Sequence, residues 1–113
     1  MVVRDYVPIA YVARVIKMAT EMALPRGSSA VFNVGSGRGM TNRTVAGIVQ
    51  RVLLTRGFKL TVEFSKSIAP GEAWRLVLDT AATTRKLGLA APTEDDVTEA
   101  IEEAALDYLA LAH

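Results

Sequence analysis

Hydrophobic residues recur along this chain at strand and helix spacings in turn. Residues 2–7 predict a first strand, which ends at Pro8 or passes there into a helix. A helical stripe predicts that helix over residues 9–24. The stripe consists of Val12, Val15, Ile16, Ala19, Met22 and Ala23. Residues 25–29, with proline, glycine and two serines, predict a loop.

The short run at residues 31–34 lacks polar alternation and predicts a strand covered on both faces. A glycine turn follows, and a helix is expected to begin near Thr41 or Thr44, run to Arg56 and end with Gly57 as its cap. Its apolar stripe is Val45, Ile48, Val49, Val52 and Leu53. A strand, a glycine turn and a helix N-terminus form a natural anion-binding geometry, because free amides converge there with the helix dipole.

The glycine turn, Gly35-Ser36-Gly37 continuing to Gly39, matches neither of two well-known phosphate loops. The Walker pattern requires a lysine after its last glycine, and no lysine follows here. The dinucleotide fingerprint requires glycine where this chain has Met40. Taken alone, glycines needed for steric reasons explain the turn as well as anion binding does.

Three further elements are expected in the second half of the chain. Residues 59–65 alternate and predict a half-exposed strand with Leu60, Val62 and Phe64 on one side. Residues 75–79 predict a short strand, after which Thr80 is expected to cap a helix that ends at residues 87–88. A last helix begins at Thr93, paired with Asp96 as in a capping box. Its predicted buried face is Val97, Ile101, Ala104, Tyr108 and Leu111.

Alternating strands and helices predict a small α/β fold, with a partial sheet of three or four strands and three or four helices. The 113 residues are expected to form a single domain, and half of them are hydrophobic. No apolar run approaches the roughly 20 residues of a membrane span. The N-terminus lacks a signal-peptide core, so we expect a cytoplasmic protein without a membrane partner. Cysteine is absent, which excludes disulfides and thiolate metal sites.

Charge is distributed unevenly along the chain. Residues 1–86 contain all 13 basic side chains and five acidic ones, a balance of +8, whereas residues 87–113 contain seven acidic side chains and no base. This division could steer an anionic ligand to the main body, although a solvated acidic face also accounts for it. The basic residues are scattered without interleaved aromatics, so we expect no nucleic-acid partner. The carboxylates of the last helix predict a solvated face rather than a metal site.

Four segments, in this order, resemble the C-terminal part of the extended short-chain dehydrogenase/reductases, the NAD(P)-dependent nucleotide-sugar epimerases and dehydratases. The segments are Arg4-Asp-Tyr-Val7 with Val12-Ala-Arg14, then Phe32-Asn-Val-Gly-Ser-Gly37, then Pro70-Gly-Glu72 with Arg75 and Leu76-Val-Leu-Asp79, and finally Thr84-Arg-Lys-Leu-Gly88 with Pro92. Together they cover nearly the whole chain.

The resemblance does not extend to catalysis. Members of the family have a Rossmann domain with Gly-x-x-Gly-x-x-Gly and a catalytic Tyr-x-x-x-Lys pair, and neither motif is present here. The residues four positions after Tyr6, Tyr11 and Tyr108 are Ala10, Val15 and Ala112. We therefore expect no catalytic residue and no site for NAD(P), the cofactor of the family. The resemblance implies a truncated, substrate-side segment that is inactive alone.

The resemblance also implies a site for a nucleotide-sugar. Arg4, Asn33 and Arg75 match family residues that hold the substrate diphosphate, and an arginine fork suits phosphate oxygens. Structural alternatives remain for each residue. Arg4 could pair with Asp79, Asn33 could satisfy backbone groups of the glycine turn, and Arg75 could simply flank a strand.

Two departures from the family pattern weaken the case for substrate binding. The chain has Pro8-Ile-Ala-Tyr11 where relatives have His-Val-Asp-Asp, so the carboxylates that cap the next helix are lost. It has Trp74 where relatives often have a second arginine, so one cationic ligand is missing. Trp74 could stack on a base or ribose, or fill a gap against the absent domain.

Three hypotheses about function follow. The first is a noncatalytic segment that binds a nucleotide-sugar. The second is a self-associating module, a homodimer that could exchange terminal elements, because strands bordering the absent domain would be exposed. The third is one half of a split enzyme with a separate Rossmann-domain partner.

Overall fold

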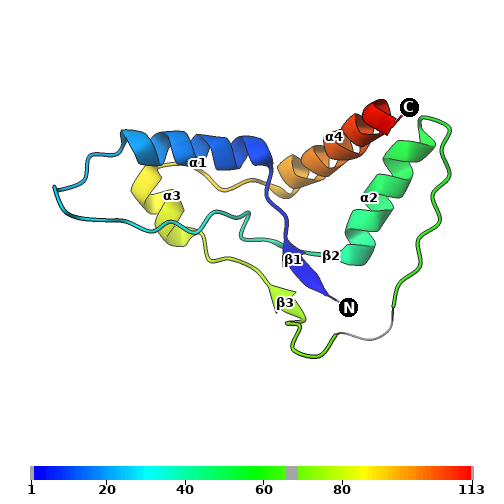
Figure 1. Ribbon diagram of the computed structural model, residues 1–113, viewed down its shortest axis with the longest axis horizontal. Helices are drawn as coiled ribbons and strands as arrows, with labels where there is room; N and C mark the ends of the chain where they lie inside the picture. Colours follow the sequence, from blue (N-terminus) through cyan, green and yellow to red (C-terminus); the bar gives the residue numbers. More distant parts are fainter. Residues whose placement is uncertain (1, 66–68, 113) are drawn as a thin grey trace.

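A computed structural model of the chain describes residues 2–65 and 69–112. Within these ranges, four helices accompany a mixed sheet of three short strands, which confirms the predicted small α/β fold (Figure 1). The elements are β1 (Val3–Asp5), α1 (Ile9–Glu21), β2 (Gly39–Thr41), α2 (Asn42–Leu54), β3 (Arg75–Leu76), α3 (Ala81–Leu87) and α4 (Glu94–Ala112). No helix in the described ranges combines the length and the apolarity needed to cross a membrane.

Strand β1 is the middle strand of the sheet. It runs antiparallel to β2 and parallel to β3. The register places Val3 beside Thr41 of β2 and beside Arg75 of β3, and Arg4 beside Leu76. Side chains alternate between the two faces of a sheet, so Arg4 and Arg75 project from opposite faces.

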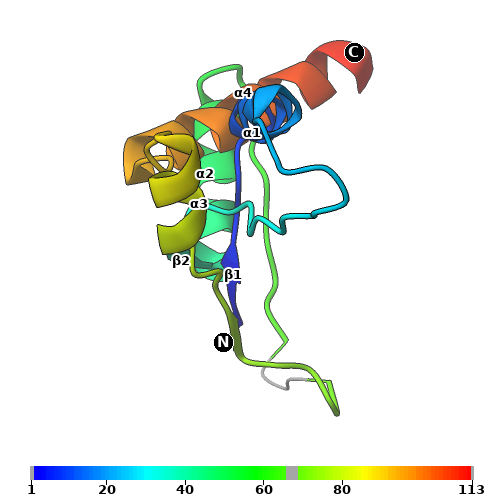
Figure 2. The ribbon, with the colours of Figure 1, turned by 90° about the vertical axis from the view of Figure 1, so that its left-hand side faces the viewer.

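The hydrophobic interior is divided between two groups of elements. Tyr11 and Val15 of α1 pack with Leu89, which follows α3, and form one buried cluster. Helix α2 packs against α4, and the pair buries Ile48, Val52 and Val97. Helices α1 and α4 lie above the sheet in both ribbon views (Figure 1, Figure 2). Two small clusters joined by a short sheet make an extended molecule, measuring 54 × 35 × 22 Å.

The ends of α2 agree with the sequence prediction. Thr41 Oγ1 accepts a hydrogen bond from the Thr44 backbone N–H at 3.1 Å, which caps the first turn. Beyond the last turn, Gly57 has φ +83° and its N–H donates to the Leu54 carbonyl at 3.0 Å. The Phe58 N–H donates to the Leu53 carbonyl at 3.1 Å. This pair of bonds is a Schellman ending, which requires a residue with positive φ.

The starts of the other helices follow the prediction in part. The capping box of α4 is confirmed, because Thr93 N–H donates to Asp96 Oδ2 at 2.8 Å and Asp96 N–H donates to Thr93 Oγ1 at 3.1 Å. Thr80 makes no side-chain cap for α3, and Asp79 Oδ1 accepts from the Ala81 N–H at 3.0 Å instead. Helix α1 begins after Pro8 without a side-chain cap, as expected from the lost carboxylates.

The capping box makes the stability of α4 sensitive to acid. The Thr93 backbone N–H, and then the Thr93 side chain, lower the pKa of Asp96 below its ordinary 3.8. A lowered folded-state pKa gives stability that is present above 3.8 and is lost as pH falls through the folded value. We expect α4 to fray when the pH falls through the lowered pKa of Asp96. An NMR titration of the Asp96 carboxyl should give a midpoint below 3.8; a midpoint at or above 3.8 would contradict the prediction.

The predicted buried strand at residues 31–34 is wrong. This segment has no regular secondary structure, and Val31 is 85% exposed. Both edges of β1 are occupied by β2 and β3. The Asn33 carbonyl accepts instead from Thr83 Oγ1 at 2.8 Å, so a side chain of α3 takes the place of a ladder partner.

The strand predicted at residues 59–65 is also wrong. The segment forms no ladder and lies alongside α2 instead. There Gln50 Nε2 donates to the Leu60 carbonyl at 3.0 Å, and the Arg43 guanidinium lies 4.6 Å from the centre of the Phe64 ring. The strand predicted at residues 75–79 is shorter than expected, because only Arg75–Leu76 pair with β1.

Two predicted buried helix faces are partly exposed. In α4, Val97 is buried, whereas Ala104, Tyr108 and Leu111 face outward. In α1, Val15 is buried, whereas Ile16 is 58% exposed. Each helix carries apolar residues over a wider arc than one neighbouring element covers. The neighbour covers Val15 in α1 and Val97 in α4 and leaves other residues of the predicted faces exposed.

Candidate functional site

The glycine turn surrounds a carboxylate from its own chain. Asp5 Oδ1 accepts from the Ser36 N–H at 2.7 Å and from Ser36 Oγ at 2.6 Å. Asp5 Oδ2 accepts from the Gly37 N–H at 3.0 Å and from the Leu78 N–H at 3.2 Å. Three backbone amides therefore converge on one carboxylate. The amides of the turn hold an anion, as the sequence predicts, but that anion is Asp5, and the third amide is that of Leu78 rather than one from the predicted helix N-terminus.

Glycine is needed for this close approach. A Cβ on Gly35 would lie 2.8 Å from Asp5 Oδ2 and 3.0 Å from a Leu78 methyl carbon, and Gly37 has φ +71°. Sequence reasoning missed Asp5. The available signal was a carboxylate at the end of a strand, in a chain whose glycine turn matches no phosphate loop.

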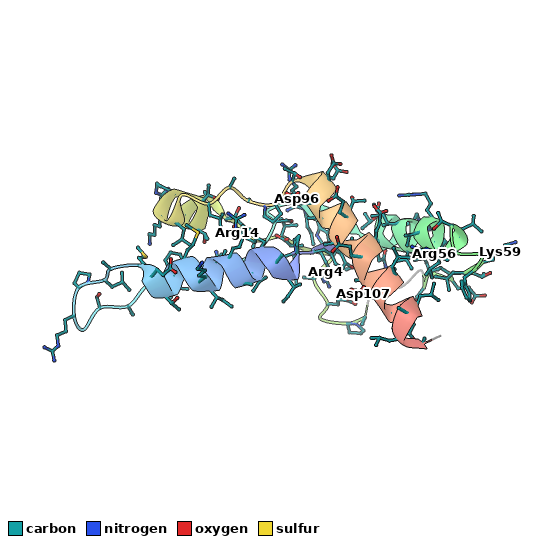
Figure 3. The ribbon with its side chains drawn as sticks, turned by 90° about the horizontal axis from the view of Figure 1, so that it is seen from above. Arg4, Arg14, Arg56, Lys59, Asp96 and Asp107 are labelled. Carbon is teal, nitrogen blue, oxygen red and sulfur yellow. The ribbon has the colours of Figure 1, made fainter. Side chains whose placement is uncertain are left out.

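Arg4 is engaged away from the glycine turn. Its Nη2 donates to Glu72 Oε1 at 3.0 Å, and its Nη1 donates to the Ala73 carbonyl at 3.0 Å. The suggested pairing of Arg4 with Asp79 is therefore wrong. The arginine connects β1 to the segment before β3, and Figure 3 shows it below the junction of α1 and α4.

Asn33 also has structural partners. Its Nδ2 donates to the Asp79 carbonyl at 3.1 Å. The side chain thus satisfies a backbone group, as the sequence allowed, but that group belongs to residue 79 and not to the glycine turn. Together with the Thr83 bond to its carbonyl, Asn33 connects the segment after α1 to the start of α3.

Arg75 lies on the other sheet face from Arg4 and reaches across toward β2. Its Nη2 is 3.8 Å from the position that a Cβ on Gly39 would occupy. The three residues assigned to a diphosphate by resemblance therefore do not converge on one point.

A cavity of about 310 Å³ lies beside the glycine turn. We call it the Arg38 cavity. It is lined by Ser36, Arg38, Gly39, Met40, Thr41, Thr44, Glu94 and Val97. It lies where β2 leads into α2, and the start of α4 closes one side.

The lining of the Arg38 cavity can bind an anion that also carries hydroxyl groups. Arg38 Nε donates to the Pro92 carbonyl at 3.4 Å, which orients the guanidinium. The hydroxyls of Thr41 and Thr44 lie 3.0 Å apart at the positive end of α2. Glu94 contributes a carboxylate that repels phosphate but accepts hydrogen bonds from hydroxyls. Sequence reasoning missed Arg38, although its place between Gly37 and Gly39 was a usable signal.

The fold and this cavity define a small mixed α/β domain with a polar cavity beside a glycine turn. Comparison of the chain with protein-family models, curated proteins and solved structures finds no match. The resemblance to the extended short-chain dehydrogenase/reductases therefore stays a prediction. Among the described residues, no group of three or more His, Cys, Asp or Glu side chains is arranged to hold a metal ion.

Proposed function

We propose that this chain is the noncatalytic, substrate-side segment of a nucleotide-sugar epimerase/dehydratase-like protein, and that it binds a nucleotide-sugar diphosphate in the Arg38 cavity. The supporting observation is the combination in one cavity of a guanidinium, two threonine hydroxyls and the first turn of a helix. Proteins hold phosphate groups with these donors. The chain lacks the Tyr-x-x-x-Lys pair that hydride transfer in this family requires, so the proposal is binding without turnover.

In this proposal, the diphosphate lies against Arg38 and the hydroxyls of Thr41 and Thr44. Glu94, the acidic side chain in the lining of the cavity, accepts hydrogen bonds from sugar hydroxyls. The volume of about 310 Å³ is near the lower limit of about 300 Å³ for ligand pockets. It suits a diphosphate and part of the sugar, with the base outside.

The three residues that the resemblance assigns to the diphosphate have different roles in this proposal. Arg75 extends toward the Gly39 strand, which forms one wall of the cavity, and it adds positive charge there. Arg4 and Asn33 serve the fold through their contacts with residues 72–73 and 79. The balance of +8 over residues 1–86 favours the approach of an anionic ligand.

Calorimetric titration with UDP- and dTDP-sugars tests the proposal. We expect weak binding, and we expect Arg38→Gln to weaken it about tenfold or more because a charge-assisted contact is lost. Arg4→Gln is the matched control and should leave affinity unchanged, since the contacts of Arg4 with residues 72–73 lie outside the lining of the cavity. Titration with pyrophosphate separates the diphosphate contribution from that of the sugar.

Two results would contradict the proposal. A folded sample that gives no heat with millimolar nucleotide-sugar would show that the cavity does not bind this ligand class. Binding that Arg4→Gln abolishes and Arg38→Gln leaves intact would place the diphosphate at Arg4 instead of in the Arg38 cavity.

A further inference from the structure

The outer sides of α1 and α4 together form an apolar face without a partner in the described chain. Its exposed members are Ile9 at 82%, Ile16 at 58%, Tyr108 at 74% and Leu111 at 89%, with Ala104 also exposed. The spacing of seven residues in α1, and of four and three in α4, places each set on one side of its helix. We call this surface the α1–α4 face; Figure 3 shows the two helices from above, with Asp107 of α4 labelled.

A cavity of about 370 Å³ occupies the junction of the two helices on this face. Ile9 from α1 and Ala104 and Asp107 from α4 contribute to its lining, together with residues 6–8. The hydrophobic pattern of α4 predicts that Ala104, Tyr108 and Leu111 are buried, but nothing in the described part of the chain covers them. The sequence thus provides an apolar helix face that the fold leaves open.

The exposed area agrees with a missing contact. The chain exposes 8173 Å², whereas a compact protein of this size exposes about 6,000 Å². Its radius of gyration is 17.1 Å, against about 13 Å for a compact chain of similar length. A standard interface removes about 800 Å² from each partner. The excess of about 2,000 Å² is more than enough for one such interface.

Charge indicates what covers the face. Helix α4 carries all seven acidic residues of the C-terminal region and no base, so two α4 helices repel one another. Lys17 of α1 is exposed beside Ile16, and Asp107 of α4 borders the cavity. A second copy therefore fits best with its α1 packed across α4 of the first copy. Lys17 of each copy then lies near Asp107 of the other, in two equivalent contacts related by the two-fold axis.

We propose that the chain forms a two-fold symmetric homodimer through the α1–α4 face, with α1 of each copy packed across α4 of the other. In this arrangement Ile9 and Ile16 of one copy cover Tyr108 and Leu111 of the other. The proposal is independent of nucleotide-sugar binding, because the Arg38 cavity keeps its own lining whether or not the dimer forms.

A charge exchange across the interface tests the dimer. Lys17→Glu and Asp107→Lys are each expected to weaken self-association about tenfold in sedimentation experiments, because each places like charges opposite one another. An equimolar mixture of the two variants should associate as strongly as the unmodified chain, because the exchanged charges attract again. Circular dichroism checks that each variant folds. Val31→Ser, which removes an exposed apolar residue outside this face, is the matched control and should have no effect.

Each remaining outcome would overturn the dimer. A chain that stays monomeric at every accessible concentration leaves the face to a different partner, such as a separate cofactor domain. A dimer that Trp74→Ser disrupts while both charge variants leave it intact lies at the β3 edge. Two variants that do not recover association on mixing exclude the α1-to-α4 arrangement.

Discussion

Replacing Asp5 with alanine is expected to destabilise the fold by about 3 kcal/mol, a large part of the stability of a small domain. The substitution leaves the amides of Ser36, Gly37 and Leu78 without their common acceptor. These amides belong to two separate segments that this carboxylate joins, so the cost includes part of the connection between them. Urea unfolding followed by circular dichroism measures the change in unfolding free energy.

Two further variants define the role of Asp5. Asp5→Asn keeps one oxygen acceptor but turns an NH₂ group toward an amide donor, so we expect a loss of about 1–2 kcal/mol. Glu21→Ala removes an exposed carboxylate at the end of α1 and should change stability by less than about 0.5 kcal/mol. If Asp5→Ala and Glu21→Ala unfold with equal free energies, Asp5 does not hold the glycine turn.

Adding one methyl group at Gly39 and at Gly47 should have opposite effects on stability. A Cβ on Gly39 would lie 2.6 Å from Val3 Cγ1 and 3.1 Å from Val77 Cγ2. Val3 is a stiff, β-branched residue in the middle strand, so the strands must separate to make room. We expect Gly39→Ala to cost about 2 kcal/mol.

Gly47 lies inside α2, and a Cβ there meets only the end of the Arg51 side chain, at 3.7 Å. Alanine is the better helix former, so Gly47→Ala should stabilise the protein by about 0.5–1 kcal/mol. Thermal unfolding of both variants provides the comparison. A Gly39→Ala protein as stable as the parent would show that β2 does not pack closely on β1.

The ends of the helices were the most predictable features of this protein. The Thr41 cap, the positive φ of Gly57 and the reciprocal pair of Thr93 and Asp96 all depend on residues within a few positions of one another. Local interactions of this kind are encoded in short sequence patterns. The α/β class follows for the same reason, because hydrophobic spacing is a local property.

The candidate site was less predictable, because its geometry depends on contacts between distant segments. Asp5 and Ser36 are 31 positions apart, so no local pattern joins the carboxylate to the turn that it fills. Arg4 and Arg75 lie on adjacent strands, yet their register places them on opposite faces. A shift of one residue in that register would have placed both on one face.

The sequence by itself determined the elements whose stability is local: the amphipathic helices, the caps of α2 and α4, and a turn of small residues whose amides favour an anion. Only the tertiary structure decided which anion that is, which strands pair, and which part of each apolar arc is covered. Residues 31–34 and 59–65 have strand-like patterns but lie outside the sheet. The physical reason is that a strand is completed by partners elsewhere in the chain, whereas a helix satisfies its own backbone.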